Sequence, residues 1–191
     1  VFLKTYTLYE NVLFRFFYGD KISARKGTLY YASPIRDILM HQMNDIKNAI
    51  EIDDIIKVIS CWRKYRAVNF QNTKILSDVK YRNTIEFRCP NATVNHIIWQ
   101  NNINAITKLL TSARLHMIDE EFIDYKIAKN NPKFEGNEYL YNAIDLKSAL
   151  EFVDVIFDNN YDKTLFLKQY LKNYQDNFGV KTAISAKRMV K

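Results

Sequence analysis

The sequence predicts an α+β fold in which a small, mostly antiparallel sheet is backed by several helices. Two observations lead to this prediction. Short stretches in the middle of the chain alternate apolar and polar residues, whereas longer stretches on either side repeat apolar residues at every third or fourth position. The chain also has only four glycines and three prolines in 191 residues. That composition excludes a disordered chain and a turn-rich β-sandwich.

The composition also limits the classes of function. An apolar content of 48% in 191 residues is enough for one domain with a sizeable core. The formal charge of +7 favours anionic partners such as nucleic acid or nucleotide phosphate, although solvated lysine-rich helix faces produce the same excess. We expect a cytoplasmic protein without a membrane partner, because no run approaches a membrane span and no apolar signal peptide opens the chain. Cys61 and Cys89 lack metal-type spacing and fit reduced thiols.

The first part of the chain is apolar and aromatic. Residues 1–18 are interpreted as a strand or a short helix. The segment GDKISARKG, residues 19–27, reads as a polar basic loop that contains Arg25. The segment TLYYA, residues 28–32, predicts a short strand.

Two helices are predicted next. Ser33 suits an N-cap and Pro34 suits the first helical position, where its missing N–H has no partner to lose. The helix over residues 34–50 then shows one apolar stripe, and a second helix runs from about residue 52 to residue 65.

The alternating stretches predict two neighbouring strands. Residues 66–72 place Asn69 on the polar face, and residues 83–89 place Glu86 and Arg88 on the polar face. Two strands joined by a modest loop are natural antiparallel neighbours. We therefore expect the three side chains to share one face of the sheet.

The best-defined helix covers residues 96–113, with Asn95 as its N-cap. Four-three spacing predicts that its buried seam consists of Trp99, Ile103, Ile106, Leu110 and Ala113.

Three further helices are predicted toward the C-terminus. One covers residues 118–128, one is capped by Asp145 and runs through residue 157, and one is capped by Asp162 and runs through residue 174. We expect residues 1–115 to form the α+β core. Residues 116–191 are expected to add a helical extension to the same domain.

The polar face of the second strand is the candidate site. Glu86 and Arg88 lie two positions apart, which is about 7 Å along a strand. The carboxylate suits a divalent cation, and the guanidinium suits phosphate or carboxylate oxygens. The alternative interpretation is a surface ion pair on a half-exposed sheet, which contributes little.

A resemblance supports the first interpretation. Residues 84–95, TIEFRCPNATVN, resemble the E-x-R-x-P-[DN]-x-[ST]-x-N segment of glutamine synthetase-like carboxylate–amine ligases, and they resemble more closely the amidoligase family. The preceding RAVNF also resembles the neighbouring strand of that family. The resemblance covers residues 65–110 and, loosely, 15–40. We expect the chain to be either a C-terminal portion with an incomplete ligase core, consistent with its start at Val1, or a chain that keeps the fold without the full metal site.

The resemblance implies an ATP-dependent ligase that joins a small-molecule or peptide carboxylate to an amine through an acyl phosphate, with Mg²⁺ as the metal. It implies that Glu86 binds the metal and that Arg88 binds phosphate or the substrate carboxylate. Asn69 would orient the substrate or a metal-bound water, and Arg25 would contact phosphate. The early strand with two alternating carboxylates, typical of the family, is not found in this sequence.

The alternative function is a non-catalytic, basic nucleic-acid-binding or scaffold protein. Its candidate surface is the C-terminal region, which contains Lys168, Lys172, Lys181, Lys187, Arg188 and Lys191. A solvated helix face and a ragged tail would show the same charges.

Overall fold

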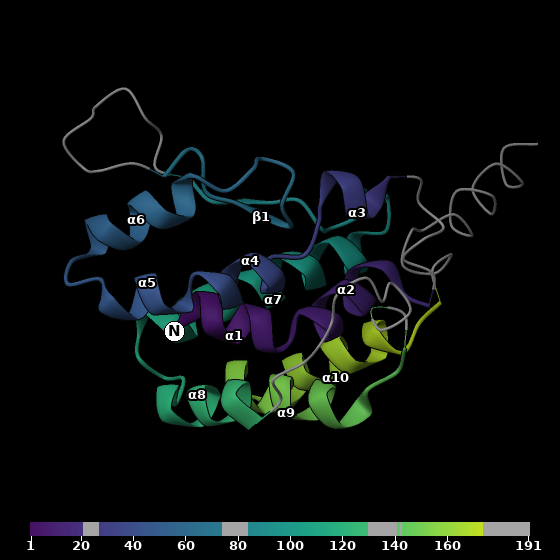
Figure 1. The fold of residues 1–191 in the computed structure, drawn as a ribbon. Helices are drawn as coiled ribbons and strands as arrows, with labels where there is room; N and C mark the ends of the chain where they lie inside the picture. The colour runs from purple at the N-terminus through teal and green to yellow at the C-terminus, as the bar shows by residue number, and fades with distance from the viewer. Residues whose placement is uncertain (21–26, 74–83, 130–140, 142, 174–191) are drawn as a thin grey trace, which may run out of the picture. The chain divides into compact units, whose positions relative to one another are not determined.

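The computed structural model describes residues 1–20, 27–73, 84–129, 141 and 143–173. The described chain is mostly helical and contains one two-stranded antiparallel sheet, which agrees with the predicted α+β class in its broad sense (Figure 1). The chain divides into two compact units. Unit 1 consists of Val1–Arg25 and Pro90–Lys191, and unit 2 consists of Lys26–Cys89. The predicted core of residues 1–115 includes parts of both units.

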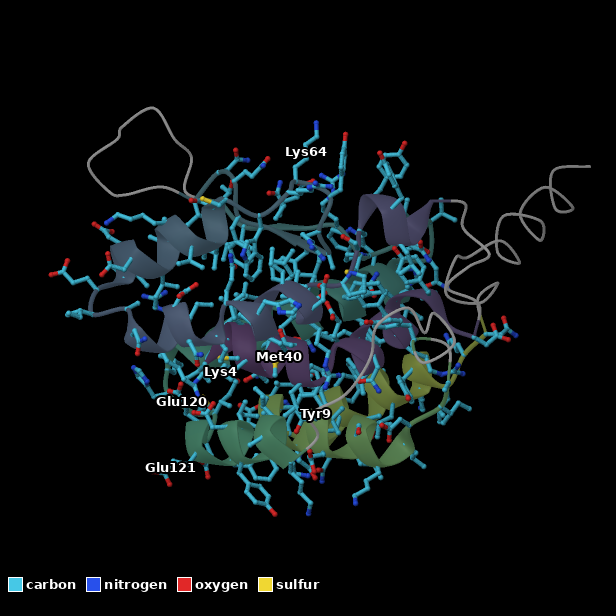
Figure 2. The ribbon with its side chains drawn as sticks, in the orientation of Figure 1. Lys4, Tyr9, Met40, Lys64, Glu120 and Glu121 are labelled. Carbon is cyan, nitrogen blue, oxygen red and sulfur yellow. The ribbon has the colours of Figure 1, made fainter. Side chains whose placement is uncertain are left out.

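Unit 1 is built from helices. Its apolar N-terminal segment forms two short helices that are almost fully buried, which explains why residues 1–18 carry so few polar side chains. Phe16 stacks on Phe166 with ring centroids 4.1 Å apart, and Lys4 pairs with Glu120 at 2.7 Å (Figure 2). The helices are α1 (Phe2–Leu8), α2 (Glu10–Tyr18), α7 (His96–Arg114), α8 (Glu120–Lys129), α9 (Leu146–Ile156) and α10 (Asn160–Tyr170).

Helix α7 exposes part of the seam that was predicted to be buried. Trp99 is 56% exposed and Ile103 is 46% exposed, and the other three seam residues, Ile106, Leu110 and Ala113, are only half-buried. The prediction of a buried seam on this face was therefore wrong. The buried face instead contains Ile98, Asn101, Asn102, Ala105, Leu109 and Ser112.

The buried amides of α7 have hydrogen-bond partners in α10, which offsets the cost of burying them. Asn101 Nδ2 donates to Gln169 Oε1 at 2.9 Å, and Gln169 Nε2 donates to Asn102 Oδ1 at 2.7 Å. The same Gln169 amide donates to the carbonyl oxygen of Phe16. Periodicity of apolar residues cannot reveal this face, because it depends on a glutamine 67 positions away from Asn102.

The N-caps of the C-terminal helices agree with the prediction in two of three cases. Asn95 accepts from the N–H groups of Ile97 and Ile98, and Asp145 accepts from that of Ser148. Helix α10, however, is capped by Asn159, which accepts from the Asp162 N–H at 2.9 Å. Asp162 lies in the first turn instead, where a carboxylate is favourable near the positive end of the helix dipole.

The described residues of unit 2 form four short helices and the sheet. Strand β1 (Val68–Asn69) pairs with β2 (Glu86–Phe87) in an antiparallel register, with Val68 opposite Phe87 and Asn69 opposite Glu86. An isolated bridge joins Ser33 to Arg66. The helices are α3 (Thr28–Tyr31), α4 (Arg36–His41), α5 (Met43–Asn48) and α6 (Ile52–Ser60).

Two predictions for the start of unit 2 were wrong. The segment TLYYA forms the helix α3, because Gly27 adopts a positive φ of 75° and its carbonyl accepts from the N–H groups of Tyr30 and Tyr31. Ser33 does not cap a helix. Its N–H and its hydroxyl both donate to the carbonyl oxygen of Tyr65, so the next helix begins only at Arg36.

The two long helices predicted in unit 2 are shorter in the structure. The first is interrupted at Gln42, which separates α4 from α5. The second, α6, ends at Ser60, and its first turn is closed by a capping box between Glu51 and Asp54. None of the described helices has the length and apolar character that a membrane span requires.

Candidate functional site

The three predicted site residues of the sheet lie together in unit 2. Asn69 Nδ2 donates to Glu86 Oε2 at 2.8 Å. Arg88 Nη1 donates to both oxygens of the same carboxylate, at 3.1 Å and 3.3 Å. Glu86 therefore connects an amide on β1 with a guanidinium just past the end of β2, as the alternation of the two segments predicted.

The sheet register positions this network. Asn69 is directly opposite Glu86, and the N–H of Arg88 donates to the carbonyl oxygen of Ala67 at 2.9 Å, which carries the pairing one step past the strand end. Asn69 is only 7% exposed, and its Oδ1 accepts from the N–H of Gln71. The Asn69 side chain is thus held at both ends of its amide.

Arg88 is held by two further groups. Its Nε donates to the carbonyl oxygen of Tyr31 at 3.0 Å, and its guanidinium carbon lies 5.7 Å from the centre of the Tyr65 ring. Among the described residues, none accepts a hydrogen bond from Nη2. The guanidinium therefore has an amino group that a phosphate or a carboxylate of a ligand would engage.

The electrostatics of the pair are those of a surface interaction. The Glu86 side chain is 49% exposed and that of Arg88 is 24% exposed. An ion pair in this setting contributes about 1 kcal/mol or less to stability. Little free energy is consequently lost when a charged group of a ligand replaces one partner of this ion pair.

A metal ion would find one carboxylate here. Mg²⁺ takes oxygen ligands and is commonly held by one or two carboxylates together with phosphate oxygens and water. Glu86 fits one such ligand. The described residues contain no group of three His, Cys, Asp or Glu side chains arranged to hold a metal ion. Glu86 would hold Mg²⁺ together with oxygens of a bound nucleotide and water.

The remaining predicted residues lie elsewhere. Arg25 is outside the described residues. Lys168 lies in the last turn of α10, and Lys172 lies just past its end. Lys181, Lys187, Arg188 and Lys191 are outside the described residues.

The sequence interpretation missed an aromatic cluster beside Arg88. Tyr30 and Tyr31 are 67% and 54% exposed, and both contact the Tyr65 ring. Lys64 lies over that ring as well, with its Nζ 4.9 Å from the ring centre. The signals in the sequence were the Tyr-Tyr pair and the basic run RKYR at residues 63–66.

No family model, curated protein or solved structure matches the chain. The resemblance to amidoligases therefore depends on the residues of the segment itself.

Proposed function

We propose that the chain is part of an ATP-dependent carboxylate–amine ligase of the amidoligase type, and that Asn69, Glu86 and Arg88 form its ligand-binding face. The observation that supports this proposal is the continuous network from Asn69 through Glu86 to Arg88. The resemblance selects these residues from two separate segments, and in the structure Asn69 and Arg88 both donate to the carboxylate of Glu86.

Each residue has a separate task in this proposal. Arg88 binds an anionic group, either a phosphate of the nucleotide or the carboxylate of the acid substrate. Glu86 contributes oxygen ligands to Mg²⁺, and the metal neutralises phosphate charge when it is bound. Asn69 holds the Glu86 carboxylate in place through its Nδ2.

Calorimetric titration of Mg–ATP into the protein tests the proposal. The informative variant is Glu86→Gln, which keeps an oxygen that can accept from Asn69 but removes the negative charge. We expect the wild-type protein to bind Mg–ATP and Glu86→Gln to lose at least about tenfold in affinity, because a carboxylate ligand to the metal is lost.

A matched control is Asp54→Asn. The Asp54 side chain is 46% exposed and pairs with Lys57, so this variant removes a comparable half-exposed carboxylate from the same unit. We expect it to bind as the wild type does. Absence of Mg–ATP binding by folded wild-type protein, or equal affinity in Glu86→Gln and wild type, would show that the Glu86–Arg88 pair is only structural.

A further inference from the structure

Unit 2 presents three tyrosine rings in mutual contact at its surface. Tyr30 and Tyr65 are stacked, with centroids 5.7 Å apart and an interplanar angle of 29°. Tyr31 meets both rings edge-on, at 4.8 Å from Tyr30 and 5.5 Å from Tyr65. Because Tyr30 is 67% exposed, much of its ring remains accessible to another flat group.

The backbone holds the cluster in place. Gly27 begins the turn that precedes α3, and a Cβ at this position would lie 3.2 Å from the Tyr31 ring. Tyr31 is also fixed through its carbonyl oxygen, which accepts from Arg88 Nε. Tyr65 is fixed in the same manner, since its carbonyl oxygen accepts from the N–H of Ser33. Each of the three tyrosines therefore belongs to a backbone segment that is held by hydrogen bonds.

Two cations accompany the rings. Lys64 and Arg88 both lie over Tyr65, at 4.9 Å and 5.7 Å from its ring centre. Figure 2 shows Lys64 extending away from the ribbon, and no described carboxylate forms an ion pair with it. Arg88 forms an ion pair with Glu86. Lys64 is therefore the cation of this surface whose charge is not paired with a described carboxylate.

A ligand that uses both features must contain flat aromatic groups and negative charge. Nucleotides meet this requirement, because bases stack on aromatic side chains and phosphates pair with cations. The exposure of the rings favours a polymer over a free nucleotide, because small ligands are normally bound in concave sites that bury most of their surface. A duplex fits less well, since its bases are already stacked on one another.

We propose that this surface, consisting of Tyr30, Tyr31, Lys64, Tyr65 and Arg88, binds single-stranded nucleic acid. A base stacks on Tyr30, and the adjacent phosphate pairs with Lys64. The net charge of +7 of the whole chain supports association with a polyanion. This surface shares Arg88 with the proposed ligand-binding face, whereas Tyr30 and Lys64, which the test below changes, belong to this surface alone. It lies on different residues from the basic C-terminal region.

The test is fluorescence anisotropy with a labelled oligo-dT of about 20 nucleotides, which is longer than the roughly 4–16 nucleotides that a single-strand site contacts. We expect Tyr30→Ala to weaken binding about tenfold or more, because one stacking platform is lost. Tyr30→Phe should bind as the wild type does, since the ring remains. Lys64→Gln should lower the slope of log K against log salt by about 0.7, which corresponds to one phosphate contact on a single strand.

Two matched controls are present in unit 1. Tyr161 is 73% exposed, so Tyr161→Ala removes an equally accessible ring. Lys129 lies over the exposed ring of Tyr125, 5.6 Å from its centre, so Lys129→Gln removes a cation from an isolated cation–ring pair. Neither control should change the affinity by more than about twofold, because neither residue belongs to a cluster of rings.

Three results would overturn the proposal: no binding by folded wild-type protein, equal affinity of Tyr30→Ala and wild type, or binding of a duplex of the same length as tightly as the single strand. The last result would indicate contacts to the phosphate backbone alone. The ligase proposal is tested separately, by Mg–ATP titration of the wild type and Glu86→Gln. A negative result in one experiment therefore does not decide the other.

Discussion

The hydroxyl of Tyr9 joins two segments of unit 1 that are far apart in the sequence. It donates to Glu151 Oε1 at 2.7 Å, and Lys126 donates to the other oxygen of the same carboxylate. Burial, reinforced by the hydrogen bond to Glu151, raises the pKa of Tyr9 well above its ordinary value. Tyr9 therefore keeps its proton in the folded protein at pH values where an unfolded chain releases it.

The stability of the protein should consequently depend on Tyr9 at alkaline pH. Its contribution is complete below the ordinary tyrosine pKa of about 10 and declines as the pH rises above that value. We expect Tyr9→Phe to cost about 1 kcal/mol at pH 7, because the Glu151 carboxylate loses a donor. Above about pH 10 the difference between wild type and variant should shrink. Urea unfolding across this pH range measures both effects.

The control for this series is Tyr161→Phe, which alters a tyrosine that is 73% exposed. It should follow the wild-type curve at every pH. A difference between wild type and Tyr9→Phe that stays constant through the alkaline range would contradict the protonation argument.

Helix α7 shows how an element can be predicted correctly while its buried face is not. Its bounds and its Asn95 cap agree with the sequence pattern. The face differs because buried amides paired with Gln169 replace part of the expected apolar seam. Ile98 is 1% exposed, whereas its neighbour Trp99 is 56% exposed.

Truncation of these two neighbours tests the orientation of α7. Ile98→Ala should destabilise the protein by about 2–5 kcal/mol, which is typical of a buried isoleucine. Trp99→Ala should cost less than about 1 kcal/mol, although the side chain removed is larger, because over half of it is in solvent. Urea midpoints with a common slope measure both. A larger loss of stability from Trp99→Ala than from Ile98→Ala would indicate that the face predicted from the sequence, which contains Trp99, is the buried one.

The two units each have a core of their own. In unit 2, Trp62 is 2% exposed, packs edge-on against Phe70 with centroids 5.8 Å apart and donates to Gln42. Fewer buried apolar residues are found in unit 2 than in unit 1 among the described residues. A smaller core buries less apolar surface and gives a less stable unit.

We therefore expect the units to unfold at different urea concentrations. In the variant Trp99→Phe, Trp62 is the remaining tryptophan of the chain and reports on unit 2 alone. Its fluorescence should change at lower urea than the far-UV circular dichroism, which is dominated by the helices of unit 1. Coincident transitions would show that the chain unfolds as one cooperative body.

The local patterns of the sequence predicted much of the secondary structure and the proximity of Asn69, Glu86 and Arg88. Strand alternation and the Asn95 and Asp145 caps depend on neighbouring residues, so they can be recognised without tertiary contacts. The start of unit 2 was predicted wrongly, because the N–H and the hydroxyl of Ser33 both donate to the carbonyl oxygen of Tyr65, 32 positions away. That pairing competes with the helix cap that Ser33 would otherwise form.

The tyrosine surface and the buried amides of α7 depend on tertiary structure. Tyr30 and Tyr65 are far apart in the sequence, and their rings meet only when α3 packs beside the segment that leads into β1. Gln169 likewise reaches Asn101 only when α10 packs on α7. A pattern of residue types records which side chains are apolar or polar. Whether a polar side chain is buried depends on a partner that the folded chain brings to it.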